Sequence, residues 1–227
     1  MEFQTVLSEL VKCFGTTLAI FLLTLIGSLP LGLLVCFGRR SKNCVLRNVT
    51  KAYISIMRGT PLMLQLWVVF FGLPMLLNWF FGLFGLRYIA DSQWRFTAAI
   101  IAFIINYAAY FAEIYRSGIE CIPKGQYEAA NVLGYGRAQA FVKIILPQMV
   151  KNVMPSVTNE VITLVKDTSL CYSIGLVEMF TRATQIANSS SDTFFVAFMT
   201  AGVMYYIFNF VVAWLMERCE KAMAYYS

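Results

Sequence analysis

Long apolar runs divide the chain and predict its main elements. Three runs carry no charged residue, at residues 13–38, 59–86 and 193–216, and a shorter apolar run covers residues 96–112. A helix needs about 20 predominantly apolar residues to cross the hydrocarbon core of a bilayer. The pattern therefore predicts three long membrane-spanning helices and, with its flanking residues, another near 94–115.

Residues 144–177 follow a different pattern. Here polar residues recur at the spacing of one face of a 3.6-residue helix, and aliphatic residues fill the positions between them. The polar stripe consists of Ser156, Asn159, Glu160, Thr163, Lys166 and Asp167. Such a helix either lies on the membrane surface or crosses the membrane with its stripe facing water. We expect a fifth span near 153–177, because charged residues inside a membrane face cavities and mark substrate paths.

Composition agrees with a bilayer as the solvent. The chain is 59% hydrophobic and 13% charged, whereas soluble domains carry about 25% charged residues. The first apolar run is too long for a secretory signal, and no basic segment precedes it. The sequence therefore predicts a single transmembrane domain over residues 1–227.

Several kinds of chemistry find no support in the sequence. The chain has no His, and its six Cys are scattered singly, so neither a metal cluster nor a redox pair is predicted. The phosphate-binding pattern GxxxxGK[ST] is also missing, so we expect no ATP site in this chain. The formal charge of +6 does not indicate nucleic acid, because a membrane protein gathers Lys and Arg in its cytoplasmic loops.

The positions of Lys and Arg predict the topology. Thirteen of the 18 basic residues lie between spans one and two, between spans three and four, or in the C-terminal tail, and only four lie in the opposite segments. The positive-inside rule then places the N-terminus outside and the C-terminus in the cytoplasm, which agrees with an odd number of spans.

The longest cytoplasmic loop, near 116–151, has the features of a helical hairpin. Pro123 favours a helix start, residues 126–133 favour a helix, and Gly134 and Gly136 favour its end. A second helical stretch leads back to the membrane before Pro147. These features leave two interpretations open, a docking site for another protein or a solvated connector.

One motif in this loop resembles a known family. The pattern E-A-A-x3-G-x9-I-x-L-P resembles the EAA motif of the permease subunits of ABC importers. Further stretches, RGTPLMLQ at 58–65, AAYFAEIYRSGIE at 108–120, KGQYEAA at 124–130 and VKDTSL at 165–170, are similar to the polar amino acid branch, the histidine-, glutamine-, arginine- and cystine-type permeases. The motif is matched at Glu128, Ala129, Ala130, Gly134, Ile144, Leu146 and Pro147.

The resemblance implies a fold and a set of partners. It implies an all-α integral membrane protein with five transmembrane helices and the type I ABC importer permease fold, over a core of about 12–217. It also implies a bacterial multi-pass protein of the cytoplasmic membrane that pairs with a second permease subunit, identical or related. The other partners implied are an ATP-binding subunit dimer, which would hold ATP and Mg, and an extracytoplasmic substrate-binding protein. The hairpin would be the coupling helix in an alternating-access cycle.

The polar stripe is the predicted substrate pathway. A free amino acid carries both an ammonium and a carboxylate, so the pathway needs both signs of charge. We expect Asn159, Glu160, Thr163, Lys166 and Asp167 to line it. Lys166 and Asp167 have an alternative role, in which they pair with each other or hold the helix end.

Three residues outside the stripe are further candidates. Gln65 in span two is expected to point toward the pathway. Arg58 is expected to act as a cytoplasmic anchor or in gating, and Glu113 to pair with Arg116 or act in gating.

Two other functions remain possible at this stage. A passive channel or membrane scaffold would explain the polar stripe but not the EAA motif. A membrane enzyme would have to rely on carboxylates alone, because no catalytic cluster is evident in the sequence.

Overall fold

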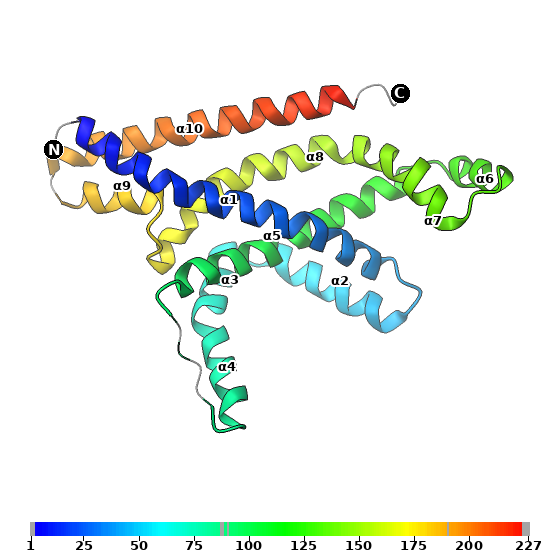
Figure 1. Ribbon diagram of the computed structural model, residues 1–227, viewed down its shortest axis with the longest axis horizontal. Coiled ribbons are helices and arrows are strands. Elements are labelled where there is room, and N and C mark those ends of the chain that lie inside the picture. The colour runs from blue at the N-terminus through cyan, green and yellow to red at the C-terminus, as the bar shows by residue number, and fades with distance from the viewer. Residues whose placement is uncertain (1–2, 87–88, 90, 190, 224–227) are drawn as a thin grey trace.

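The computed structural model describes residues 3–86, 89, 91–189 and 191–223, and every regular element among them is helical (Figure 1). In chain order the elements are α1 (Phe3–Arg39), α2 (Cys44–Gly59), α3 (Leu62–Trp67), η1 (Val68–Gly72), α4 (Leu73–Gly82), α5 (Trp94–Glu120), α6 (Lys124–Val132), α7 (Arg137–Ala140), η2 (Phe141–Ile145), α8 (Leu146–Asp167), η3 (Thr168–Ile174), α9 (Met179–Ala187) and α10 (Ser191–Ala222).

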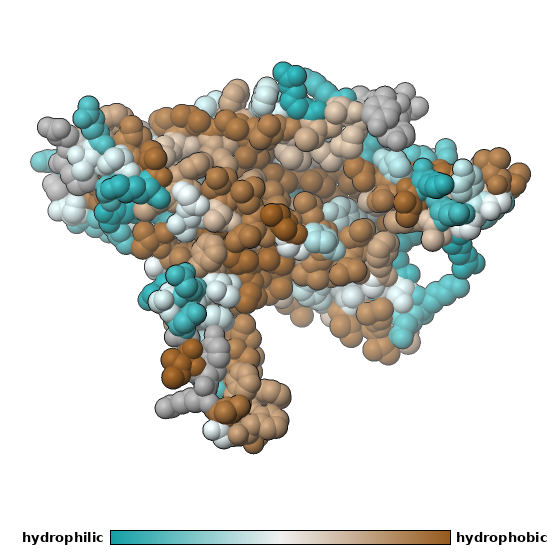
Figure 2. Space-filling view, viewed as in Figure 1, coloured by the Kyte–Doolittle hydropathy of each residue, from teal (hydrophilic) through white to brown (hydrophobic). Residues whose placement is uncertain are grey.

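Four long helices, α1, α5, α8 and α10, run along the long axis of the molecule, and α4 projects steeply away from them (Figure 1). The α6–α7 hairpin lies at one end and α9 at the other. The start of α1 lies at the α9 end, whereas α10 runs from that end toward the hairpin. In Figure 2 the middle of the visible face is mainly apolar, and polar residues gather toward both ends.

Among the described residues, four helices are long and apolar enough to cross a membrane. They are Phe3–Arg39, Leu62–Gly82, Trp94–Glu120 and Asp192–Ala222. The described chain therefore has four such spans, whereas the sequence predicted five. The missing one is α8, whose charged stripe lowers its hydropathy.

The segment predicted as the fifth span also differs in its ends. Its α-helix begins at Leu146 and stops at Asp167, after which the chain continues as the 3₁₀ helix η3. Gly175, with φ of 68°, then reverses the chain in the left-handed region that glycine adopts readily. The helix therefore ends ten residues earlier than the predicted boundary of 177.

The second predicted span, 59–86, is not one continuous α-helix. It begins after Pro61 and passes through a π-helical turn, η1, before α4. Pro74 has no N–H to donate to the carbonyl of Phe70, four residues earlier. The indole N–H of Trp94 donates to this carbonyl over 2.9 Å. The start of α5 thereby supports the point at which the arm formed by α4 leaves the bundle.

Small residues allow α1 and α5 to pack closely. A Cβ atom on Gly32 of α1 would lie 2.8 Å from the Cβ of Phe111 and 3.1 Å from the carbonyl oxygen of Ala108. Six alanines of α5 are fully buried: Ala98, Ala99, Ala102, Ala108, Ala109 and Ala112. Such small-residue contacts are typical of helix packing in membranes, where close approach of backbones replaces the hydrophobic effect as the driving force.

Two helices, α2 and α9, were not predicted. The Asn43 side chain caps α2 by accepting hydrogen bonds from the N–H groups of Val45 and Leu46, at 2.9 and 3.3 Å. Apart from Arg58, the basic residues of this segment were interpreted only as a topology signal. In the structure they belong to an amphipathic helix that contacts α1 and α5.

Candidate functional site

The hairpin at one end of the molecule is built by capping interactions. Gly134 has φ of 76°, and the N–H of Tyr135 donates to the carbonyl of Ala130 over 3.0 Å. This is the Schellman arrangement that ends α6 and turns the chain toward α7. The two residues before Gly134, Val132 and Leu133, lie at the tip of the hairpin and are 87% and 72% exposed. The hairpin thus presents an apolar tip to its surroundings.

The seven motif residues divide between the two limbs of the hairpin. Glu128 and Ala129 are exposed on α6, whereas Ala130 is buried against the rest of the hairpin. Ile144 and Leu146 are half-buried where the π-helical turn η2 joins α8, and Pro147 lies at the start of α8. The motif therefore covers both the outer surface of the hairpin and its connection to α8.

A cavity of about 250 Å³ lies between α2, α5 and α8. Arg58, at the end of α2, lies over the ring of Tyr110 of α5, with 5.4 Å from its guanidinium carbon to the ring centre. Glu160 enters the cavity from α8, together with Ser156 of the same polar stripe. The cavity thus contains a guanidinium, a carboxylate, hydroxyl groups and an aromatic ring.

The carboxylate of Glu160 is half-buried and has no ion-pair or hydrogen-bond partner among the described residues. Glu113, on the same cavity, is paired with Arg116, as the sequence predicted for these neighbouring turns. Arg116 also contacts Glu120 over 2.5 Å. Glu160 is therefore the carboxylate of this cavity that remains open to a cationic ligand.

The structure does not gather the whole polar stripe at one place. Asp167 accepts a hydrogen bond from the buried Tyr107 over 2.7 Å. Lys166 instead lines a separate cavity of about 260 Å³, with Phe180 and Tyr205. Glu160 and Lys166 were predicted to line one pathway, but within this chain they line different cavities.

The other predicted pathway residues have local contacts. Asn159 is exposed, and its carbonyl accepts from the Thr163 hydroxyl over 2.9 Å. Gln65 is buried, and its amide donates to the Met57 carbonyl over 2.9 Å and to the Thr60 hydroxyl over 2.8 Å. Gln65 therefore joins α3 to the end of α2. This structural role is additional to the predicted role in the pathway.

Sequence reasoning missed Tyr107 and Tyr110 as site residues. They lie three residues apart on α5, and Glu113 follows at the same interval. This spacing places the three on one face of the helix. The same periodicity that identified the stripe of α8 could have identified this one.

Sequence reasoning also missed Glu178, which is fully buried at the start of α9. Its carboxylate accepts from the N–H groups of Phe180 and Thr181 at 2.8 and 2.7 Å. It also accepts from the hydroxyls of Thr181, Tyr205 and Thr17 at 2.9, 2.8 and 3.3 Å. This network joins α1, α9 and α10 through one carboxylate.

Taken together, the fold and the site define a helical membrane protein with a polar cavity beside a charged helix and a hairpin at one end. Among the described residues no cluster of His, Cys, Asp and Glu is suited to a metal ion. The family model for the binding-protein-dependent transport system inner membrane component matches residues 28–225. The chain belongs to this family.

Curated relatives cover most of the chain. A putative glutamine transport system permease protein, GlnP of Rickettsia typhi, is 34% identical over 91% of this chain and 89% of its own length. The L-cystine transport system permease protein TcyL of Bacillus subtilis is 36% identical over 90% and 83%. The arginine transport system permease protein ArtQ of the same organism is 35% identical over 90% and 88%.

Solved structures confirm the type I ABC permease fold. The crystal structure of an amino acid ABC transporter with histidines matches with a TM-score of 0.80 and 28% identity, over 98% of this chain and 99% of that chain. The inward-facing MetNI methionine ABC transporter matches with a TM-score of 0.68 at 19% identity, over 96% of each chain, which shows the fold alone. The chain is the permease component of an ABC amino acid importer, a multi-pass inner membrane protein. In such importers ATP hydrolysis belongs to partner proteins.

Proposed function

We propose that this chain moves a polar amino acid across the cytoplasmic membrane by alternating access, driven by a separate ATPase. The cavity lined by Arg58 and Glu160 supports this proposal most directly. A free amino acid presents a carboxylate that fits the guanidinium and an ammonium that fits the unpartnered carboxylate. The volume of about 250 Å³ is adequate for one small ligand.

The proposed pathway follows α8. Thr163, Asp167 and Gln65 would meet the substrate on its way in from the extracytoplasmic end, and Glu160 and Asn159 would contact it deeper, at the cavity. Lys166 faces another cavity of this chain, so its contact with the pathway would require a surface supplied by the second permease subunit. Arg58 and Glu113 would hold the cytoplasmic mouth of the cavity.

We propose that α8 is a fifth crossing, although its composition alone does not identify it as one. Its polar stripe includes Asn159 and Lys166, both exposed in the isolated chain, while the opposite face is buried. A polar face exposed to lipid would be costly. The face is therefore expected to border a water-filled space shared with a second permease subunit, identical or related.

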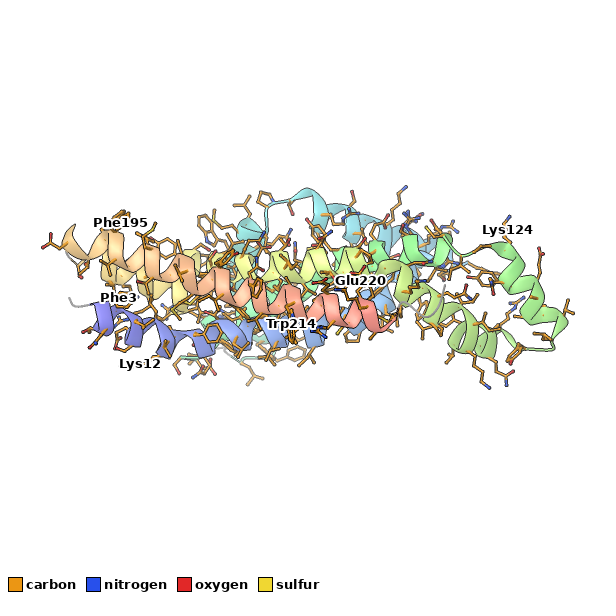
Figure 3. The ribbon with its side chains drawn as sticks, turned by 90° about the horizontal axis from the view of Figure 1, so that it is seen from above. Phe3, Lys12, Lys124, Phe195, Trp214 and Glu220 are labelled. Atoms are coloured by element: carbon orange, nitrogen blue, oxygen red, sulfur yellow. The ribbon has the colours of Figure 1, made fainter. Side chains whose placement is uncertain are left out.

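The topology proposed is an N-terminus outside and a C-terminus in the cytoplasm, in a single transmembrane domain over 1–227. Phe3 and Phe195 lie at one end of the molecule and Lys124, at the start of the hairpin, at the other (Figure 3). The guanidinium of Arg218 lies over the ring of Trp214, at 5.0 Å, near the hairpin end of α10. Trp is enriched at both interfaces of a membrane, and Arg on the cytoplasmic side.

The loop near 116–151 would be the coupling element. The exposed Val132 and Leu133 at its tip would enter a groove on the ATP-binding subunit dimer, which holds ATP and Mg. Closure of that dimer would pull on α6, and η2 with Pro147 would pass the movement to α8. An extracytoplasmic binding protein would deliver the amino acid at the opposite end.

The test is co-expression of this chain with an ATPase subunit encoded beside it, followed by purification and reconstitution in lipid. ATP hydrolysis would be measured with a panel of amino acids and their binding proteins. One amino acid is expected to stimulate hydrolysis. If no ATPase subunit co-purified, the coupling role would be rejected, and a passive channel would become the better interpretation.

A further inference from the structure

A second cavity, of about 350 Å³, lies where the end of α1 meets the hairpin. It is separate from the cavity that contains Glu160, and the proposed transport function does not use it. Six of its lining residues carry the argument: two arginines, two polar residues and two aromatic residues. They are Arg40, Arg137, Tyr127, Asn131, Phe37 and Phe141.

The two arginines are poorly neutralised. Arg137, on α7, is exposed and has no ion-pair partner among the described residues. Arg40 has a single described acidic partner, Glu120, at 3.9 Å. That carboxylate is held more closely by Arg116, at 2.5 Å. Two guanidinium groups, which favour bidentate binding of phosphate, therefore line one cavity with little opposing charge.

The opposite wall of the cavity is apolar. The rings of Phe37 and Phe141 meet edge to face, with centres 5.6 Å apart, and Phe37 remains 43% exposed. Phe37 is the last aromatic residue of the first apolar run before the charged pair Arg39 and Arg40. The cavity thus lies at the level where the apolar part of α1 gives way to charged residues, and it presents both surfaces to one ligand.

We propose that this cavity binds an anionic phospholipid. Its phosphate would lie between Arg40 and Arg137, its headgroup would meet the Tyr127 hydroxyl and the Asn131 amide, and an acyl chain would pack on Phe37. Basic pockets between helices on the cytoplasmic side of membrane proteins suit such headgroups. The choice of the cytoplasmic leaflet rests on the topology proposed above, whereas binding itself does not.

A lipid in this place would also connect two elements that move in the proposed cycle. Arg40 follows the end of α1, and Arg137 begins α7 of the hairpin. A phosphate bound to both would fix the hairpin against the first span. Anionic lipid is therefore expected to raise the substrate-stimulated ATPase activity of the assembled transporter.

Native mass spectrometry tests the binding directly. The full-length chain would be equilibrated with equal amounts of phosphatidylglycerol and phosphatidylcholine, and the retained lipid would be measured. Phosphatidylglycerol is expected to be retained preferentially. Arg137→Gln should lower its retention about fivefold, as for the loss of one basic residue near a membrane surface, and adding Arg40→Gln should lower it further. Arg137→Lys should recover most of the loss.

The matched control is Arg47→Gln, which removes an exposed arginine of α2 outside the cavity. It should leave retention unchanged. Equal retention of the two lipids, or full retention by the double variant, would overturn the proposal. So would displacement of the lipid by millimolar inorganic phosphate, because the site would then recognise a free anion. Since this measurement needs neither ATP nor a partner, loss of lipid binding and failure of the transport function would be told apart.

Discussion

At the scale of single residues, Glu178 shows how much one buried carboxylate organises. It accepts five hydrogen bonds from four residues, and these residues belong to α1, α9 and α10. A buried charged group is stable only where hydrogen bonds replace its lost water. Here the backbone N–H groups at the start of α9 supply part of that replacement, as expected at the positive end of a helix.

Glu178→Ala is predicted to destabilise the protein strongly. The substitution leaves five donors without their acceptor, three of them buried, and each unsatisfied buried group costs about 1–3 kcal/mol. The midpoint of thermal unfolding in detergent should fall well below that of the unmodified protein. The midpoint of Glu178→Gln, which keeps one acceptor oxygen, should fall less. Equal midpoints for the alanine variant and the unmodified protein would show that the network contributes nothing to stability.

Glu160→Gln is predicted to impair transport without affecting assembly. A hydrogen bond to a charged group contributes about 1.5–3 kcal/mol, so the apparent affinity for a cationic ammonium should fall at least about tenfold. Uptake by reconstituted transporter would be measured as a function of amino acid concentration. Glu220→Gln, which changes an exposed carboxylate of α10 that does not line the cavity, is the matched control and should behave normally. Normal uptake by the Glu160 variant would remove this residue from the pathway.

At the scale of elements, the close contact of α1 with α5 depends on Gly32. Gly32→Ala would place a Cβ atom 2.8 Å from the Cβ of Phe111 and 3.1 Å from a backbone oxygen. Because the backbone has to shift, we predict a loss of about 1–3 kcal/mol, typical of overpacking. Gly202→Ala on α10 meets nothing within 4 Å and should be neutral or stabilising. Comparison of the two unfolding midpoints tests the contact, and a midpoint for Gly32→Ala equal to that of Gly202→Ala would contradict it.

The hairpin offers a test of coupling. Gly134 has a left-handed backbone with φ of 76°, and a side chain there would meet no neighbour. Gly134→Val therefore acts through backbone strain alone, about 1–2 kcal/mol or more for a β-branched residue. Stimulation of the ATPase by substrate should fall about tenfold, while Gly134→Asn, which tolerates this conformation, should retain it. Full stimulation in the valine variant would contradict a role for the hairpin's shape in coupling.

The elements also show what the sequence could and could not reveal. Uncharged runs predicted α1, α5 and α10, and local signals predicted the helix before Gly134 and the turn at it. The support of the bend at Pro74 was not predicted, because it comes from Trp94, 20 residues farther along the chain, whose indole bonds the Phe70 carbonyl. The amphipathic α2 was missed because its basic residues were considered only as charges and not for their helical spacing.

The candidate site was predicted in part. Periodicity identified the polar face of α8 and therefore Glu160, because spacing along one helix is a local property. Periodicity did not show that Glu160 and Lys166 line different cavities. Glu160 shares its cavity with α5, whereas Lys166 shares its cavity with α10. Nor did periodicity bring Arg58 and Tyr110 to Glu160, since that requires the packing of three helices.

At the scale of the whole molecule, the topology can be tested with cysteines that the chain already contains. Cys44, Cys121 and Cys219 are exposed and would face the cytoplasm in the proposed orientation. A membrane-impermeant maleimide should label them in inverted vesicles but not in intact spheroplasts. A variant in which Cys44, Cys121 and Cys219 are replaced by Ser and Ser92, just before the start of α5, is replaced by Cys should show the opposite behaviour. Labelling of Cys121 in intact spheroplasts would reverse the orientation.

The most direct test of the whole account is ATP-driven uptake in proteoliposomes. Radiolabelled amino acid and its binding protein would be placed outside vesicles that contain this chain, with ATP and Mg sealed inside with the ATPase subunits. We predict uptake against a gradient that stops when ATP or the ATPase is omitted. Movement of the amino acid at the same rate without the ATPase, and only down its gradient, would contradict a coupled importer and indicate a passive channel.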